Sequence, residues 1–125
     1  MFNFSASAQG APSQITAWVH EKKNIPQICK VGLFTKILGG KWKLAILWNL
    51  RDKTLRFGQL ASIMDGVSRK VLSDQLQQLE SDGLVSRKSY NETPPRVEYS
   101  RTTIAKNLEP LFNKLEEWVD SNYFK

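Results

Sequence analysis

The sequence predicts a mostly helical fold that carries a small β-hairpin, which places it in the α+β class. Apolar residues recur at spacings of three and four along several stretches, as expected for helices with one buried face. Residues 84–90 and 97–101 flank the rigid segment Thr93-Pro94-Pro95, which favours a pair of short strands. With 125 residues, 41% of them hydrophobic, the chain is long enough for one domain with a small core.

The N-terminal part of the chain predicts three helices after a polar segment. Residues 1–12 are small and polar, and we expect them to be mobile or to become ordered only against a partner. We expect a single domain over residues 13–125, beginning with a short helix that carries Ile15, Trp18 and Val19 and ends before Pro26. A second helix is expected over residues 27–38. A third, over residues 41–50, is apolar on most sides and should be central in the core.

A short strand and a short helix are expected next. Residues 54–57 favour the strand, and residues 59–64 favour the helix, with Gly58 as its cap. The inward-facing residues of this helix would be Leu60, Ile63 and Met64.

A longer helix is predicted after the turn at Asp65-Gly66. Ser68 offers a side-chain oxygen to cap its first turn, and Gly83 ends it. Its apolar positions, four and three residues apart, are Leu72, Leu76 and Leu79. The short helix, the turn and this helix form a helix-turn-helix, and the hairpin after it forms a wing. The sequence thus predicts a winged helix-turn-helix, with the DNA-reading part at about residues 41–102.

Cationic and amide side chains are left on the outside of this unit, where they could contact bases and phosphates of a duplex. On the long helix they are Ser68, Arg69, Lys70, Ser73 and Gln77, and on the wing they are Arg87, Lys88 and Arg96. Lys41 and Lys43 at the start of the third helix are further candidates for phosphate contact, or are simply solvated. Asp74 would repel phosphate unless it pairs with Lys70 or faces a cytosine amine.

The C-terminal residues 103–123 predict a long helix that bends or restarts near Glu109, because Pro110 cannot donate a backbone hydrogen bond. Its apolar stripe could fold back on the domain's own core or pair with a second copy. We favour a homodimer that also uses the helix bearing Trp18. The stripe consists of Leu108, Leu111, Phe112, Leu115, Trp118 and Val119.

The charge is concentrated in the predicted DNA-reading part. The chain has a formal net charge of +6. Residues 1–102 carry 15 Lys and Arg against 8 Asp and Glu, whereas residues 103–125 carry 3 against 4. This distribution favours an anionic partner for the first part, and double-stranded DNA fits it.

Other classes of function are disfavoured by composition. One cysteine cannot form an internal disulfide framework, residues 1–10 lack the pattern of a signal peptide, and no apolar run approaches about 18 residues. We therefore expect a cytoplasmic protein that does not bind a membrane. His20 has no companion ligands, so no metal site is expected. Without a phosphate loop or a catalytic constellation we expect neither an enzyme nor a cofactor.

Four motifs, in this order, resemble those of the HxlR family of winged helix-turn-helix regulators. They are GGKWKL at residues 39–44, LRF at 55–57, LSDQLQQLESDGL at 72–84 and PPRVEYS at 94–100. The match runs from about Cys29 to Trp118. The resemblance implies a cytoplasmic dimeric transcription factor whose N- and C-terminal helices build the dimer and whose helix from Ser68 enters the major groove.

The resemblance also implies a sensor role for Cys29, because several family members respond to electrophiles, aldehydes or oxidants at the corresponding cysteine. Two departures bear on this role. Lys30 stands where the family usually has proline, and Glu116-Glu117 precede Trp118 where a second cysteine is common. A lone cysteine can also be only a small buried hydrophobic residue.

The sequence therefore predicts a sequence-specific DNA-binding regulator that acts as a homodimer on a (pseudo)palindromic operator. The resemblance adds a reactive small molecule as an effector sensed at Cys29. The alternative is a winged-helix module that contacts proteins without reading DNA.

Overall fold

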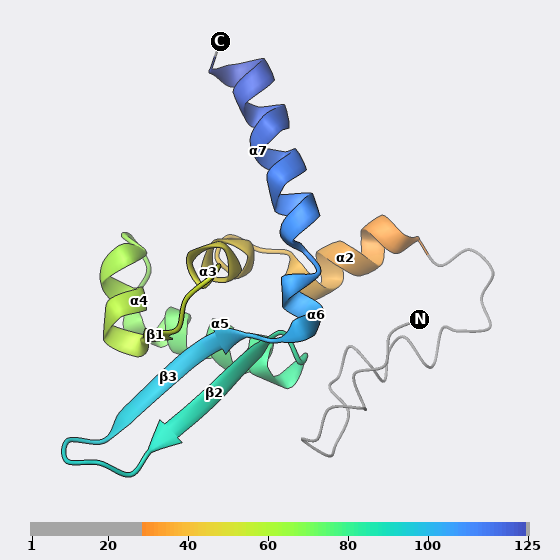
Figure 1. The fold of residues 1–125 in the computed structure, drawn as a ribbon. Helices are drawn as coiled ribbons and strands as arrows, with labels where there is room; N and C mark the ends of the chain where they lie inside the picture. Colours follow the sequence, from red (N-terminus) through yellow and green to blue (C-terminus); the bar gives the residue numbers. More distant parts are fainter. Residues whose placement is uncertain (1–28, 125) are drawn as a thin grey trace, which may run out of the picture.

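The computed structural model describes residues 29–124, and the predicted α+β class is confirmed. Figure 1 shows a helical body from which the β2–β3 hairpin and the C-terminal helix project in different directions. The predictions for residues 1–12 and for Ile15, Trp18, Val19 and His20 lie outside the described residues. The elements are α2 (Lys30–Leu38), α3 (Lys43–Asn49), β1 (Leu55–Arg56), α4 (Phe57–Ile63), α5 (Arg69–Ser81), β2 (Val85–Tyr90), β3 (Arg96–Arg101), α6 (Thr103–Lys106) and α7 (Glu109–Tyr123).

The helices α2 and α3 are both shorter than predicted. Cys29 is the N-cap of α2 with extended backbone angles, so the helix begins at Lys30 rather than at residue 27. Gly40 has a φ of 97°, which interrupts the helical path after α2, and α3 begins only at Lys43. As predicted, α3 is central: Ile46 and Leu47 are fully buried.

The hairpin belongs to a three-stranded antiparallel sheet with the order β1-β3-β2. The register pairs Val85 with Arg101 at the base of the hairpin and Tyr90 with Arg96 near its tip. The predicted strand over residues 54–57 is confirmed only for Leu55–Arg56, and Leu55 pairs with Tyr99. Because β1 leads directly into α4, the sheet fixes the start of the helix-turn-helix.

The predicted boundaries of α4 were wrong. The helix begins at Phe57, with Arg56 as its N-cap, so Gly58 lies inside the helix and does not cap it. The side chain of Gln59 accepts a hydrogen bond from the backbone N–H of Arg56 at 2.8 Å and so closes the first turn. Leu60 and Met64 fill the core, but Ile63 is 45% exposed, and its predicted inward position is wrong.

The predicted limits of α5 hold closely. Ser68 caps the helix, and its three leucines are buried with at most 1% exposure. Asp82 is the C-cap, and Gly83 follows with a φ of 79°, a conformation that glycine adopts without steric cost. The leucines of α5 join a continuous core with residues of α2, α3, α4, the sheet and α7.

The C-terminal segment divides into two helices, as Pro110 predicted. Glu109 and Pro110 form the first turn of α7, and the chain leaves α6 at Asn107. Phe112 is only 4% exposed and meets Trp48 edge-on, with ring centroids 5.6 Å apart. Its predicted place in a dimer interface is therefore wrong, since it fills the core of its own chain. Leu108 also packs against that core.

Candidate nucleic-acid interface

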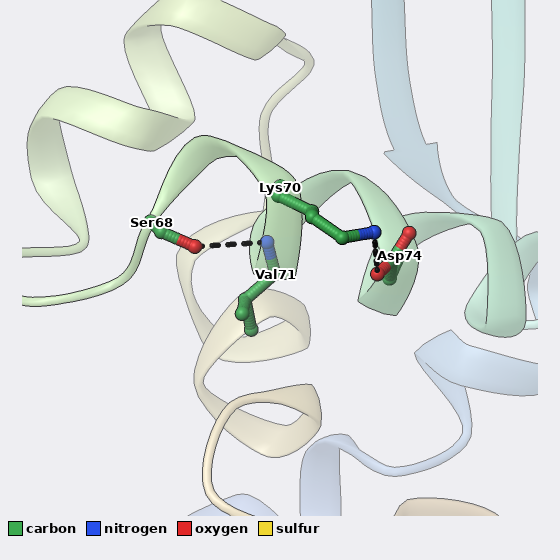
Figure 2. Close-up of polar contacts among 4 residues, drawn as sticks. All are labelled: Ser68, Lys70, Val71 and Asp74. Carbon is green, nitrogen blue, oxygen red and sulfur yellow. Dashed lines mark hydrogen bonds and ion pairs between the residues drawn. The ribbon is translucent and has the colours of Figure 1, made fainter.

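The start of α5 is held by a side-chain cap. The hydroxyl oxygen of Ser68 accepts a hydrogen bond from the backbone N–H of Val71 at 3.0 Å, as Figure 2 shows. Gly66, with a φ of 90°, makes the preceding turn. Substituting alanine for an N-cap serine typically costs about 1 kcal/mol of stability, so this cap fixes where the first residues of α5 lie.

The outer face of α5 is polar and open. Arg69, Lys70, Ser73 and Gln77 are all exposed. Lys70, Ser73 and Gln77 lie on the side of the helix away from its three leucines, and Arg69 is its first residue. The ammonium nitrogen of Lys70 lies 3.2 Å from a carboxylate oxygen of Asp74 (Figure 2). This is one of the pairings that the sequence left open for Asp74.

Arg69 has an aromatic neighbour that the sequence did not single out. Its guanidinium carbon lies 5.3 Å from the ring centroid of Phe57, the first residue of α4. A cation over a ring face at this distance is attracted by about 0.5–1 kcal/mol at an exposed site. The contact links the two helices of the helix-turn-helix and limits the directions in which Arg69 can point.

The three basic residues predicted for the wing differ in their exposure and in their ion pairs. Arg87 and Lys88 are exposed on β2, and the Lys88 nitrogen is 5.2 Å from the Tyr90 ring centroid. Arg96 instead lies 3.3 Å from Glu92 and 3.4 Å from Glu98, and its guanidinium carbon is 3.9 Å from the Tyr90 ring centroid. Two carboxylates therefore offset its charge. The contacts of Arg96 link Glu92, between the two strands, to Glu98 on β3 and Tyr90 on β2.

The two lysines near the start of α3 also differ in their exposure. Lys41 is exposed beside the ring of Trp42, with its nitrogen 4.9 Å from the ring centroid. Lys43 is only 8% exposed. A surface role for Lys43 is not supported by this burial, whereas Lys41 remains available to a partner.

Sequence reasoning missed the partly buried ion pair at the base of the wing. The Arg101 side chain is 4% exposed and donates to a carboxylate oxygen of Glu109 at 3.0 Å. Next to it, the Thr102 hydroxyl donates to the Gly83 carbonyl at 2.7 Å. The signal was present: Val97, Tyr99 and Arg101 alternate along β3, so an arginine stands at an inward position, where it needs a carboxylate.

Cys29 is the N-cap residue of α2. It is exposed, and its sulfur accepts a hydrogen bond from the backbone N–H of Gly32 at 3.2 Å. Reactive cysteines are commonly found at such helix N-termini.

The α7 helix presents apolar side chains that residues 29–124 leave exposed. Leu111, Leu115 and Trp118 are 38%, 42% and 57% exposed. Figure 1 shows this helix extending away from the rest of the fold. Tyr123 lies near Trp118, with ring centroids 5.5 Å apart, and Phe124 is also exposed.

Residues 29–124 contain no group of three or more His, Cys, Asp or Glu side chains placed to hold a metal ion. None of the helices described there is long and apolar enough to cross a membrane.

Comparison with known proteins agrees with this geometry. The family described as HxlR-like helix-turn-helix matches residues 37–125. The HTH-type transcriptional regulator YybR of Bacillus subtilis is 38% identical over 105 residues, which are 82% of this chain and 84% of that protein.

Two redox-related solved structures share the fold. The redox regulator HypR in its oxidised form is 37% identical, with a TM-score of 0.70 over 75% of this chain and 97% of the other. The reduced form of the transcriptional regulator YodB from B. subtilis is 28% identical, with a TM-score of 0.68 over 77% and 94% of the two chains. YodB has also been solved after diamide treatment. From the match over most of its length, and from the winged helix-turn-helix described above, the chain belongs to the HxlR family of transcriptional regulators.

Proposed function

We propose that this regulator binds a (pseudo)palindromic operator as a homodimer, reading bases with α5 and phosphates with the wing, and that oxidants, electrophiles or aldehydes control this binding through Cys29. The observation that carries the DNA-reading part is the serine-capped α5, whose exposed polar face lies in the same unit as the basic wing. A helix of this kind fits the major groove of B-DNA.

The roles of individual residues follow from their exposure. Arg69, Lys70, Ser73 and Gln77 face the groove, where arginine can pair with guanine and glutamine with adenine through two hydrogen bonds each. The capping residue Ser68 begins the helix at the groove. The exposed cations Lys41, Arg87 and Lys88 neutralise backbone phosphates, which positions the protein without selecting a sequence.

The homodimer is supported by the uncovered face of α7. Leu111, Leu115 and Trp118 would be buried against the second copy, together with the half-buried Val119. In this proposal Ile15, Trp18 and Val19, outside the described residues, complete the interface. Two α5 helices would then meet half-sites about one helical turn apart, which is why the operator is expected to be palindromic.

Replacing Arg69 with alanine is expected to weaken binding to an operator duplex by roughly 1–3 kcal/mol and to relax base preference at one position. The operator probe is the tightest duplex selected from a random pool by the wild-type protein. Lys88→Ala is the matched control, because loss of a phosphate contact should weaken all duplexes alike and lower the salt slope by about 1. Equal losses on operator and random DNA for Arg69→Ala would refute base reading.

The sensor role of Cys29 is supported by its exposed sulfur at a helix N-terminus and by the likeness to HypR, named a redox regulator, and to YodB. The chain has one cysteine. An oxidised Cys29 would therefore form a disulfide with Cys29 of a second copy or with a small thiol, and an electrophile would alkylate the sulfur directly.

The deciding experiment measures operator binding across a salt series with reduced protein and with protein treated with diamide or an aldehyde. We expect treatment to change operator binding in wild type and to leave Cys29→Ser unchanged, with a disulfide-linked species on non-reducing gels after diamide. Specific binding that ignores treatment would remove the thiol switch and leave the regulator. If no duplex outcompetes random DNA, a protein-contact module becomes the better explanation.

A further inference from the structure

Asp74 places a carboxylate on the face of α5 that is proposed to meet DNA. Positions 70, 74 and 77 are four and three residues apart, so they follow one side of the helix, opposite the buried Leu72 and Leu76. The Asp74 side chain is 48% exposed, and one of its carboxylate oxygens lies 3.2 Å from the ammonium nitrogen of Lys70, whose side chain is 84% exposed. A negative group thus lies among the residues expected to approach a polyanion.

Helix stability does not account for this pair. Exposed ion pairs contribute about 0–1 kcal/mol, and a lysine that precedes its acidic partner by four residues is in the less favourable order for a helix. Lys70 is the second residue of α5, and a positive charge is disfavoured near the N-terminus of a helix. The first turn of α5 contains no acidic residue that would offset this charge. The Lys70–Asp74 ion pair therefore contributes little to the stability of the fold.

The pair does change how the surface meets DNA. Binding to any sequence depends on cations that neutralise phosphates, whereas discrimination depends on contacts to base edges. While Asp74 holds Lys70, one cation is withdrawn from phosphate binding and one negative charge is added beside the backbone. Both effects weaken binding to every duplex, and only a duplex that offers a donor to the carboxylate, such as the amino group of cytosine, offsets them.

We propose that Asp74 is a specificity-determining residue that acts by weakening binding to non-operator DNA. In random duplexes it faces phosphates and unsuitable base edges, and Lys70 stays bound to it. In the operator a cytosine amino group donates to Asp74, and Lys70 is released to a neighbouring phosphate. Building an unfavourable contact against wrong partners is a general route to specificity. This inference rests on the DNA-reading function proposed above.

Asp74→Asn tests the proposal, because it removes the charge and keeps the size of the side chain. We expect tighter binding to a random duplex, with a salt slope steeper by about 1 as Lys70 becomes available to phosphate. The ratio of operator to random affinity should fall by at least about fivefold, the lower limit for one lost base contact. In a Lys70→Gln background, Asp74→Asn should no longer steepen the slope.

The chain supplies a matched control in Lys114 and Glu117, an exposed ion pair at 3.4 Å on α7. Glu117→Gln changes the net charge by the same amount far from the wing and α5 (Figure 1), and random-DNA affinity should change less than twofold. An equal gain from Glu117→Gln would reduce the effect to net charge and overturn the proposal, as would an unchanged affinity ratio in Asp74→Asn. A wild-type protein that does not distinguish operator from random DNA would instead refute the proposed DNA reading.

Discussion

Replacing Leu115 and Trp118 together with aspartate is expected to convert the proposed homodimer into a monomer and to weaken operator binding by about 10²–10⁴-fold. The loss follows because a dimer that holds one half-site presents its second α5 to the other at a high effective concentration, and a monomer does not. Both side chains are more than 40% exposed in the single chain, so the fold of each protomer should survive. Sedimentation equilibrium and operator titration measure the two effects.

The control for this pair is Asn113→Asp, which adds a charge at an exposed position of the same helix. It should leave both mass and operator affinity near wild-type values. A double variant that sediments as a dimer would place the interface elsewhere. A variant that sediments as a monomer yet binds the operator with full affinity would show that one α5 suffices.

The apolar stripe of α7 also shows what could not be predicted from the sequence alone. Phe112 and Leu115 are three residues apart on one predicted face, and nothing in their spacing separates them. In the fold Phe112 turns to Trp48 in the core, whereas Leu115 stays exposed, because only the first turns of α7 lie against the helical body. The tertiary position of α3 decides which half of the stripe is free for a partner, and no local pattern encodes it.

The elements that were predicted well are those in which several local signals agree. In α5 the serine cap, the leucine spacing and the closing glycine all point to the same limits. In α4 they conflicted: Gly58 suggested a cap, but the first turn is closed by Gln59 on the backbone of Arg56. A glutamine that reaches back three residues is a recognised capping partner, and it was the better signal.

Charged residues were the hardest part of the site to predict, because their roles depend on neighbours distant in sequence. Lys43 is buried, Arg96 lies between two carboxylates, and Arg101 pairs with Glu109 across the base of the wing. All three appear in the sequence as ordinary basic residues of a basic segment. Of the basic residues predicted to contact DNA, those that stay exposed and outside the wing-tip ion pairs lie on α5, on β2 and at Lys41.

Truncating Leu76 to alanine is expected to lower the free energy of unfolding by about 2–5 kcal/mol. Leu76 is 1% exposed at the centre of the α5 contact with the core, so the substitution removes buried methyl groups and leaves a cavity. A domain of this size has only about 5–15 kcal/mol of stability, and the denaturation midpoint should fall markedly. Urea titrations should compare variants at one protein concentration, because the proposed dimerisation would add to the stability measured.

Gln77→Ala is the neighbouring control, since Gln77 is exposed on the opposite side of α5. It should change stability by no more than about 0.5 kcal/mol but weaken binding to the operator if Gln77 contacts a base. Leu76→Ala should show the reverse, with operator affinity retained at temperatures where the variant is folded. If Gln77→Ala destabilised the protein as much as Leu76→Ala, the division of α5 into a core side and a DNA-reading side would be wrong, and the proposed base contacts would lose their structural basis.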